Sequence, residues 1–472
     1  MSGTKSKSPL LILTWVCIVA GACVVRIMAA RGGMWLDEVY TIDLLRTVDS
    51  VWTILTNLPY DTNHVLYSVL MYATGQPFEP LSYRWPSILA GAGSVIVAGL
   101  LTRRFGTASA LFAGVLIGFT HLMIFFGSEA RGYSLMTFFA LTGALALDRH
   151  FEKPRLAWIA LFSISCSLGM LSHLLFLQAY FALGLWWAAM RWPWRWNAIA
   201  EGLLLHTLPF ATAAFLYFVL IRRMEVVGAI EFTLMGALQA AAASLVGVRP
   251  GSLESSAALA VVAAVVIGGV TLLILRRDRL WIFFALLGLA SPALTIAMSS
   301  LSVLQPRHFM LSLVCALLLA SIMLGLWARQ GGMARIGAVA ACAALLWASA
   351  GDTVHLIRFG RGQYGEIVQT IAERSPRAEV LVSGDHDVRH RMMVEDYAPT
   401  VAPAKTIRYL THEMSGVAPP EWIILHDFEF EPRARPTITD RVTGRTYALV
   451  AAYPRAKHAG WNCYLYQHVS SP

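Results

Sequence analysis

Long apolar stretches, separated by short charged loops, run through the first three quarters of the chain. About eleven of them come close to the roughly 20 residues that a helix needs to cross a bilayer. Two shorter apolar patches, at 63–73 and 233–248, are flanked by polar residues and are predicted to lie at the membrane interface. The pattern therefore predicts an all-α polytopic membrane protein with about eleven transmembrane helices, at 10–30, 86–101, 107–126, 133–148, 156–174, 175–190, 197–220, 256–275, 280–298, 308–327 and 335–350.

The polarity changes after Ala350, where charged residues of both signs become frequent. We predict that residues 1–350 form the membrane domain, with a first external loop at 31–85, and that residues 351–472 form a small, soluble α/β domain. Apolar positions in the C-terminal segment alternate between helical and strand spacing. The predicted helices are Tyr364–Glu373 and Asp387–Asp396, and the predicted strands lie near Glu379–Val382, Trp422–Leu425, Tyr447–Ala451 and Tyr464–Tyr466.

The basic residues indicate the orientation, because Lys and Arg concentrate in the cytoplasmic loops of membrane proteins. With the N-terminus in the cytoplasm, the inner segments hold fourteen cations against four acids, whereas the outer loops hold more acids than cations. Treating either interfacial patch as a span would place basic loops on both sides. The predicted N-terminus is therefore cytoplasmic and the C-terminal domain periplasmic. The inner cations are Lys5, Lys7, Arg103, Arg104, Arg149, Lys153, Arg155, Arg191, Arg195, Arg276, Arg277, Arg279, Arg329 and Arg335, and the acids are Asp148, Glu152, Glu201 and Asp278.

The composition supports this class of protein and excludes others. The chain is 57% hydrophobic and 14% charged, whereas soluble domains have about a quarter of charged residues. The net charge of +9 is explained by the inner loops, so nucleic acid is not expected as a partner. Five of the six cysteines lie in apolar stretches, which leaves no disulfide framework or zinc-ligand spacing. No cofactor is predicted. Asp385-His386-Asp387 with His390 has residue types that can bind a metal, but an ordinary solvated turn is the favoured interpretation, so no metal is predicted.

The first outer polar cluster follows the first span. Asp37 and Glu38 are adjacent acids at a membrane boundary, where charge is costly unless it is solvated or functional. On the functional interpretation, Asp37 is a general base that deprotonates a hydroxyl group. On the plainer one, the pair belongs to a solvated loop that helps to set the topology.

The second cluster opens the patch at 63–73. His64 and Tyr67 are three residues apart, so on a helix they would share one face. That face is suited to a sugar or a phosphate, or it places two amphipathic side chains at the headgroup level. Arg84 precedes the second span, where it either pairs with a lipid phosphate or extends to the headgroups.

Two outer turns carry further cations. The segment 128–133 is a tight polar turn between long apolar spans, and it contains Glu129, Arg131 and Tyr133. Arginine recognises phosphate oxygens with paired, charge-assisted hydrogen bonds, although a Glu129–Arg131 pair that caps the turn is the alternative. The same two interpretations apply to Arg307 and His308 in the second turn. His173, at the outward end of its span, is either a ligand or a hydrogen-bonded residue of the helix end.

Taken in order, these motifs resemble the GT-C superfamily of glycosyltransferases, which use lipid-phosphate sugars. The likeness is to the bacterial branch of protein O-mannosyltransferases, lipid A aminoarabinose transferase and rhizobial lipopolysaccharide galacturonosyltransferases, and it spans about residues 10–350. The motifs are Asp37-Glu38, Asn63-His64 with Leu66-Tyr67, Tyr83-Arg84 with Pro86-Ser87, Ser128-Glu129-Ala130-Arg131-Gly132-Tyr133, Ser172-His173 and Pro306-Arg307-His308.

The resemblance implies a membrane enzyme that transfers a sugar from a polyprenyl-phosphate donor to an envelope acceptor, such as lipopolysaccharide, lipid A or another surface glycan. It implies the periplasmic face of the bacterial inner membrane, inversion at the anomeric carbon, and Asp37 as the catalytic base. A transporter or flippase of a lipid-linked sugar and a protein O-glycosyltransferase remain the alternatives. The expected substrate-binding residues are Glu38, His64, Tyr67, Arg84, Glu129, Arg131, Tyr133, His173, Arg307 and His308.

Overall fold

The computed structural model describes residues 9–60, 62–75, 79–224, 232–298, 304–415, 418–429, 433–455 and 460–469. Lys5 and Lys7, two of the cations on which the predicted orientation rests, lie outside these residues. The described chain divides into two compact units. The first contains residues 9–28, 48–74 and 83–353, and the second contains residues 29–47, 75–82 and 354–469, with the gaps given above.

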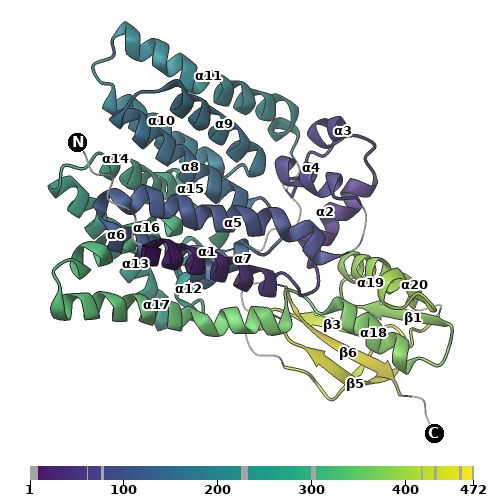
Figure 1. The fold of residues 1–472 in the computed structure, drawn as a ribbon. Helices are drawn as coiled ribbons and strands as arrows, with labels where there is room; N and C mark the ends of the chain where they lie inside the picture. The colour runs from purple at the N-terminus through teal and green to yellow at the C-terminus, as the bar shows by residue number, and fades with distance from the viewer. Residues whose placement is uncertain are drawn as a thin grey trace. The chain divides into compact units, whose positions relative to one another are not determined.

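The predicted apolar stretches are helical over most of their described residues, and these helices make up most of the first unit (Figure 1). Seven helices in the described part of the chain are long and apolar enough to cross a membrane, so the fold class is the predicted one, while the count of eleven stays a prediction. The helices are α1 (Pro9–Ala29), α5 (Pro80–Thr102), α6 (Thr107–Phe119), α7 (His121–Phe126), α8 (Tyr133–Glu152), α9 (Leu156–Ser172), α10 (Phe176–Met190), α11 (Trp196–Val219), α13 (Leu253–Leu275), α14 (Leu280–Ala285), α15 (Ser291–Met298), α16 (Met310–Ala328) and α17 (Gly332–Phe359).

The two predicted interfacial patches are also helical. Residues 63–73 contain α4 (Val65–Ala73), and residues 233–248 contain α12 (Leu234–Val246). Both helices are shorter than the roughly 20 residues needed to cross a bilayer. The first external loop adds α2 (Leu36–Arg46) and α3 (Val51–Thr56).

The stretch 107–126, predicted as one span, is broken at Thr120. This residue has extended backbone angles and separates α6 from α7. The guanidinium group of Arg26, on α1, donates hydrogen bonds to the carbonyl oxygens of Ile117, Gly118 and Met123, at 2.9–3.3 Å. Carbonyl groups at the end of a helix lack partners within the helix, so the buried arginine satisfies them where the helix stops. Hydropathy alone shows no sign of this break.

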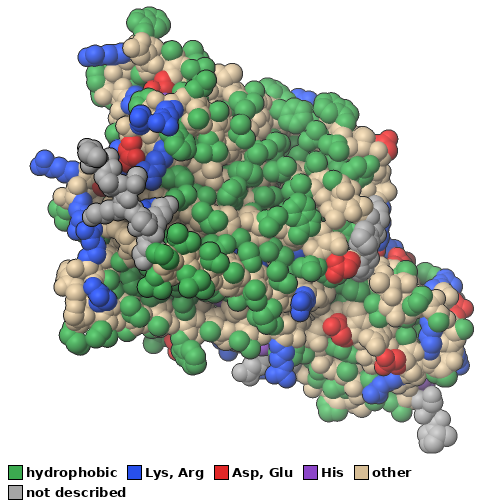
Figure 2. Space-filling model, in the orientation of Figure 1, with side chains coloured by type: hydrophobic (Ala, Val, Ile, Leu, Met, Phe, Trp, Pro, Cys, Tyr) green, Lys and Arg blue, Asp and Glu red, His purple; other side chains and the backbone are tan. Residues whose placement is uncertain are grey.

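Apolar side chains cover the visible face of the helical unit (Figure 2). Large hydrophobic residues on the helices are widely exposed, as on a surface that faces lipid rather than water. Blue Lys and Arg side chains gather at the end of the helices where the α13–α14 connection lies (Figures 1 and 2). The exposed apolar residues include Leu203, Phe210, Val261, Leu275, Ile336 and Trp347.

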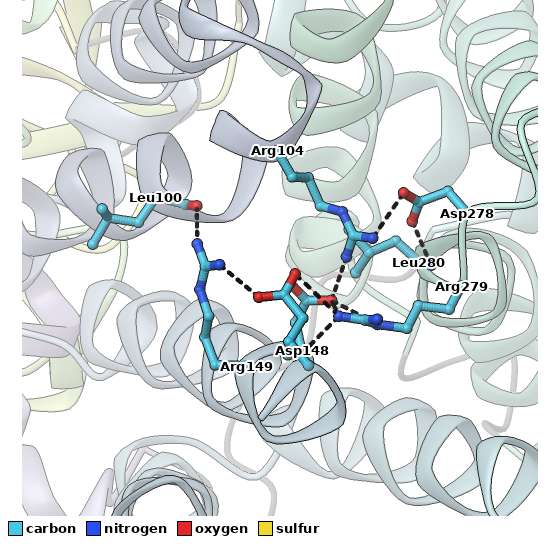
Figure 3. Close-up of polar contacts among 8 residues, drawn as sticks. Leu100, Arg104, Asp148, Arg149, Asp278, Arg279 and Leu280 are labelled. Carbon is cyan, nitrogen blue, oxygen red and sulfur yellow. Dashed lines mark hydrogen bonds and ion pairs between the residues drawn. The ribbon is translucent and has the colours of Figure 1, made fainter. Parts of the chain in front are cut away.

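An ionic network joins three helices at that basic end (Figure 3). The buried carboxylate of Asp148, at the end of α8, lies 2.5 Å from Arg104 and 2.8 Å from Arg279. Arg104 also pairs with Asp278 at 3.0 Å. These four residues were all assigned to inner loops from the charge pattern. The ends of α5 and α8 and the start of α14 therefore meet on one side, as the predicted alternation of spans requires.

The C-terminal part of the second unit is a small α/β domain, as predicted. Its six-stranded sheet has the order β2-β1-β3-β6-β5-β4, in which β1 is parallel to β2 and β3, and the remaining pairs are antiparallel. The strands that the sequence did not predict are β2 and β4. The elements are α18 (Tyr364–Arg374), β1 (Glu379–Gly384), α19 (Asp387–Val401), β2 (Thr406–Tyr409), α20 (His412–Ser415), β3 (Trp422–Asp427), β4 (Thr437–Thr439), β5 (Thr446–Tyr453) and β6 (Asn462–His468).

Candidate functional site

The site in the first unit is built around the turn between α7 and α8. Ser128 donates from its hydroxyl group to the carbonyl oxygen of Ile124 at 2.7 Å, which closes the end of α7. Gly132 then brings the turn against the end of α9, because a Cβ atom there would overlap the carbonyl oxygen of Ser172 and approach His64. The absence of a side chain at Gly132 therefore allows these segments to meet.

Arg131 is held by His64. The Nε atom of Arg131 donates to the Nε2 atom of His64 at 3.1 Å, and the guanidinium carbon lies 5.5 Å from the centre of the Tyr133 ring. Both partners are almost fully buried. His64 lies at the N-cap of α4, and the helix begins at Val65, so His64 and Tyr67 are not two residues within one helix. The backbone angles of His64 are not helical (φ −82°, ψ 83°).

The rings of His64, His173 and Tyr133 pack against one another next to Arg131. The rings of His64 and His173 are stacked with their centres 4.4 Å apart, and Tyr133 lies 4.4 Å from His173. The Nδ1 atom of His173 accepts a hydrogen bond from the backbone of Leu175 at 3.1 Å, so the helix-end role expected for this histidine is present. The same residue also faces His64, as a site residue would.

Arg307 brings a second positive charge to the cluster. Burial lowers the pKa of His64 well below its usual value, and the charges of His173, Arg131 and Arg307 lower it further. A neutral imidazole can accept a hydrogen bond, which is the role that His64 has toward Arg131. Arg307 lies in the short 3₁₀ turn Pro306–Phe309 together with His308. The structure therefore brings Arg131 and Arg307 close enough to the buried imidazole of His64 for both charges to act on it.

The other predicted residues of this unit support the turn. The hydroxyl group of Tyr67 donates to the carbonyl oxygen of Tyr83 at 2.8 Å, and Ser87 donates to the carbonyl oxygen of Arg131 at 3.2 Å. Arg84 and Glu129 are fully buried. For Arg84, this excludes the interpretation in which its head extends to lipid headgroups.

Asp37 and Glu38 belong to the second unit. Glu38 is buried, and its carboxylate accepts a hydrogen bond from the backbone N–H of Trp35 at 3.2 Å, which caps α2. Asp37 is partly exposed in the first turn of α2, where the helix dipole favours negative charge. The two adjacent acids therefore differ in environment, and Asp37 is the more accessible one.

Residues of the C-terminal domain hold the segment that leads to Asp37. The hydroxyl group of Tyr397 accepts from the backbone N–H of Met34 at 2.6 Å and donates to its carbonyl oxygen at 2.9 Å. Burial lowers the pKa of Arg389, and Asp37 is among the negative groups that oppose this effect. No pattern in the sequence predicts these contacts, because they join positions more than 350 residues apart.

No protein-family model matches the sequence, and no curated protein matches it. The structure is similar to that of ArnT from Cupriavidus metallidurans in the apo state, with a TM-score of 0.55, 13% identity, and coverage of 87% of this chain and 92% of that one. ArnT bound to undecaprenyl phosphate gives a TM-score of 0.50 at 12% identity, with 99% of both chains covered. The archaeal oligosaccharyltransferase AglB from Archaeoglobus fulgidus, in complex with an inhibitory peptide and a dolichol-phosphate, gives 0.46 at 11%, with coverage of 87% and 69%.

The chain therefore has the GT-C fold in its ArnT-like form, with a helical membrane part and a small C-terminal sheet domain. This confirms the fold that the order of motifs implied. At this level of identity the likeness concerns architecture, and the chemistry has to be argued from the chain's own residues.

Proposed function

We propose that this protein is a membrane glycosyltransferase that transfers a sugar from a polyprenyl-phosphate donor to an acceptor of the cell envelope, at the periplasmic face of the bacterial inner membrane. One observation carries the proposal: Arg131, oriented by the buried His64, lies in a cluster with Arg307 that has the charge to bind a phosphate group. The GT-C fold supports the class of reaction, and an ArnT structure contains undecaprenyl phosphate.

The arginines serve the leaving group. As the bond between the anomeric carbon and the phosphate oxygen breaks, negative charge develops on the phosphate. Fixed cations aimed at developing charge stabilise a transition state without reorganisation. The hydrogen bond from Arg131 to His64 fixes the orientation of the guanidinium plane. Because the imidazole is neutral, it accepts this bond and does not repel the guanidinium group.

Asp37 acts as the base in this proposal. It accepts the proton of the acceptor hydroxyl while the hydroxyl oxygen bonds to the anomeric carbon from the side opposite the phosphate. The configuration at that carbon is then inverted in a single displacement. The partial exposure of Asp37 suits contact with an acceptor, whereas the carboxylate of Glu38 is engaged in capping α2. The acceptor is a hydroxyl of lipopolysaccharide, lipid A or another surface glycan.

The test is transfer from radiolabelled polyprenyl-phosphate sugars by the purified full-length protein in liposomes. Hexose, pentose and uronic acid donors are compared, with envelope lipids from a strain that lacks this chain as acceptors. We expect a labelled glycolipid with the wild type, and a loss of about 10²–10⁴-fold with Asp37→Asn. Asp49→Asn is the matched control, because Asp49 lies in the same external loop and its carboxylate accepts from Thr53 at 2.6 Å.

Each rival has its own result in this assay. Wild-type turnover by Asp37→Asn would remove Asp37 from the role of base. Movement of the labelled lipid across the bilayer without a glycosidic product would indicate a transporter or flippase. Label recovered in protein would indicate a protein O-glycosyltransferase, and equal use of diphosphate-linked donors would contradict the proposed donor class.

A further inference from the structure

Three potential metal ligands meet at the carboxyl ends of β1 and β3 in the C-terminal sheet. Asp385 directly follows β1, His390 lies in the first turn of α19, and His426 lies near the end of β3. The Nε2 atom of His390 and the Nδ1 atom of His426 lie 2.8 and 2.7 Å from the same oxygen, Oδ1 of Asp385. One ligand atom from each residue is within 4.8 Å of the other two.

The sheet topology places this cluster where ligands commonly bind in α/β sheets. β1 lies between β2 and β3 and is parallel to both. The chain therefore passes from β1 through α19 to β2 on one side, and later reaches β3 on the other. In α/β sheets, ligands bind at the carboxyl ends of the strands where the connections diverge in this way. Asp385 and His426 stand at the carboxyl ends of β1 and β3, which are paired up to Gly384 and Ile424.

The cluster is closed on one side and accessible on the other. His390 is 1% exposed, whereas the side chains of His426 and Asp385 are 13% and 33% exposed. The second carboxylate oxygen of Asp385 accepts from the backbone N–H of His426 at 3.1 Å, which fixes the orientation of the carboxylate. The ring of His386 lies 5.9 Å from that of His426, at the exposed side.

We propose that Asp385, His390 and His426 bind a divalent transition-metal ion, with Zn²⁺ as the best match to two imidazole nitrogens and one carboxylate oxygen. Such ligands lie about 2.0–2.2 Å from zinc, which corresponds to about 3.3 Å between ligand atoms in a tetrahedron. The present separations of 2.7 and 2.8 Å therefore widen by about half an ångström, within reach of small side-chain rotations. Water or His386 completes the coordination.

The proposed ion would join the loop after β1, the start of α19 and the end of β3. It would therefore stabilise the first turn of α19, in which Arg389 is the neighbour of His390. The proposal concerns the C-terminal domain by itself and does not depend on the sugar-transfer reaction.

The test is metal binding by the full-length, tag-free protein after removal of metal with EDTA. Zn²⁺ is titrated calorimetrically, Co²⁺ is followed by its visible absorption, and Cu²⁺ paramagnetic resonance counts the coordinated imidazoles. We expect one Zn²⁺ per chain, two coordinated imidazoles from the cluster, and a higher melting temperature with Zn²⁺. Asp385→Asn and His426→Gln should weaken Zn²⁺ binding at least tenfold, while both variants melt like the wild type in EDTA.

His468→Gln is the matched control. His468 lies at the end of β6, beside the start of β3, so it is at the opposite end of the strands from the cluster. Its ring is 5.5 Å from that of Tyr447. Its substitution should leave Zn²⁺ binding unchanged. Binding that persists in Asp385→Asn and His426→Gln, or a wild-type protein that binds no Zn²⁺ at micromolar concentration, would overturn the proposal. If either variant fails to fold, the imidazole count on the wild type decides.

Discussion

Arg131 donates a hydrogen bond from Nε to the Nε2 atom of His64, 67 residues earlier in the chain, at 3.1 Å. This bond uses the one guanidinium nitrogen that lies along the side chain, so it fixes the plane in which the two terminal NH₂ groups point. A lysine has no equivalent of this bond, because its ammonium group is a single point charge. The relationship therefore predicts which substitutions at this position are tolerated.

We expect Arg131→Lys to lower the rate of sugar transfer by about 10²–10³-fold, the usual effect of losing one transition-state donor. His64→Ala should lower kcat less, by about tenfold, because Arg131 keeps its charge and loses only its orientation. The measurement is kcat and KM for the donor in liposomes. His206→Ala is the control, since His206 contacts Tyr180 on another part of the helical unit. Equal activity of Arg131→Lys and the wild type would contradict the role of a planar guanidinium.

Gly132→Ala tests the close approach of the turn to α9. The added Cβ atom would overlap the carbonyl oxygen of Ser172, which is backbone and cannot move without shifting the helix end. We expect a lower melting temperature and loss of transfer activity. Gly251→Ala is a poor control because Gly251 has a positive φ of 79°. Gly351→Ala is a better one, since a Cβ there meets nothing within 4 Å, and it should leave both quantities unchanged.

Tyr397→Phe tests whether the C-terminal domain positions Asp37. The substitution removes both hydrogen bonds to the backbone of Met34, each worth about 1 kcal/mol. We expect kcat to fall about tenfold with the KM for the donor unchanged, because the donor cations are untouched. Tyr453→Phe is the control, since it removes a hydroxyl group that contacts Thr370 at 2.7 Å in the same domain. A similar loss in both variants would indicate a general effect on stability.

Asp148→Asn tests the ionic network at the basic end. The buried carboxylate faces Arg104 and Arg279, so its neutralisation leaves two partly buried cations short of negative charge. Breaking such a pair costs about 3–5 kcal/mol when the partner is buried, and the partial exposure of these arginines should reduce the loss to about 2 kcal/mol. A lower melting temperature in detergent is the readout. Glu152→Gln, at a more exposed position of the same network, should have a small effect.

Asp43 makes the stability of the second unit depend on pH. Burial and the nearby charge of Asp396 raise the pKa of Asp43 from 3.8 to about 6, although Arg46 opposes the shift. The folded unit therefore holds a proton that the unfolded chain has already released, and its stability falls as the pH rises from about 4 to about 6. Asp43→Asn should raise the melting temperature above pH 6 and change it little at pH 4. Glu379→Gln, at an exposed pair, should not alter this pH profile.

The membrane helices could be predicted because their cause is local. A segment in lipid must satisfy its own backbone hydrogen bonds and expose apolar side chains, so a stretch such as Leu253–Leu275 identifies itself by composition. The same holds for the helices and inner strands of the C-terminal domain, where apolar spacing follows the geometry of each element. The short edge strand β4 (Thr437–Thr439) has too few apolar positions to produce such a pattern.

The tertiary structure decided which residues contact one another. The sequence alone determined that the protein is a many-helix membrane protein with a charged C-terminal domain, because hydropathy and charge act residue by residue. It could not determine that Arg26 ends α6, that His64 orients Arg131, or that Tyr397 holds the segment before Asp37. Each of these contacts joins positions far apart in the chain, and such contacts form only when packing brings the helices and the sheet into their final places.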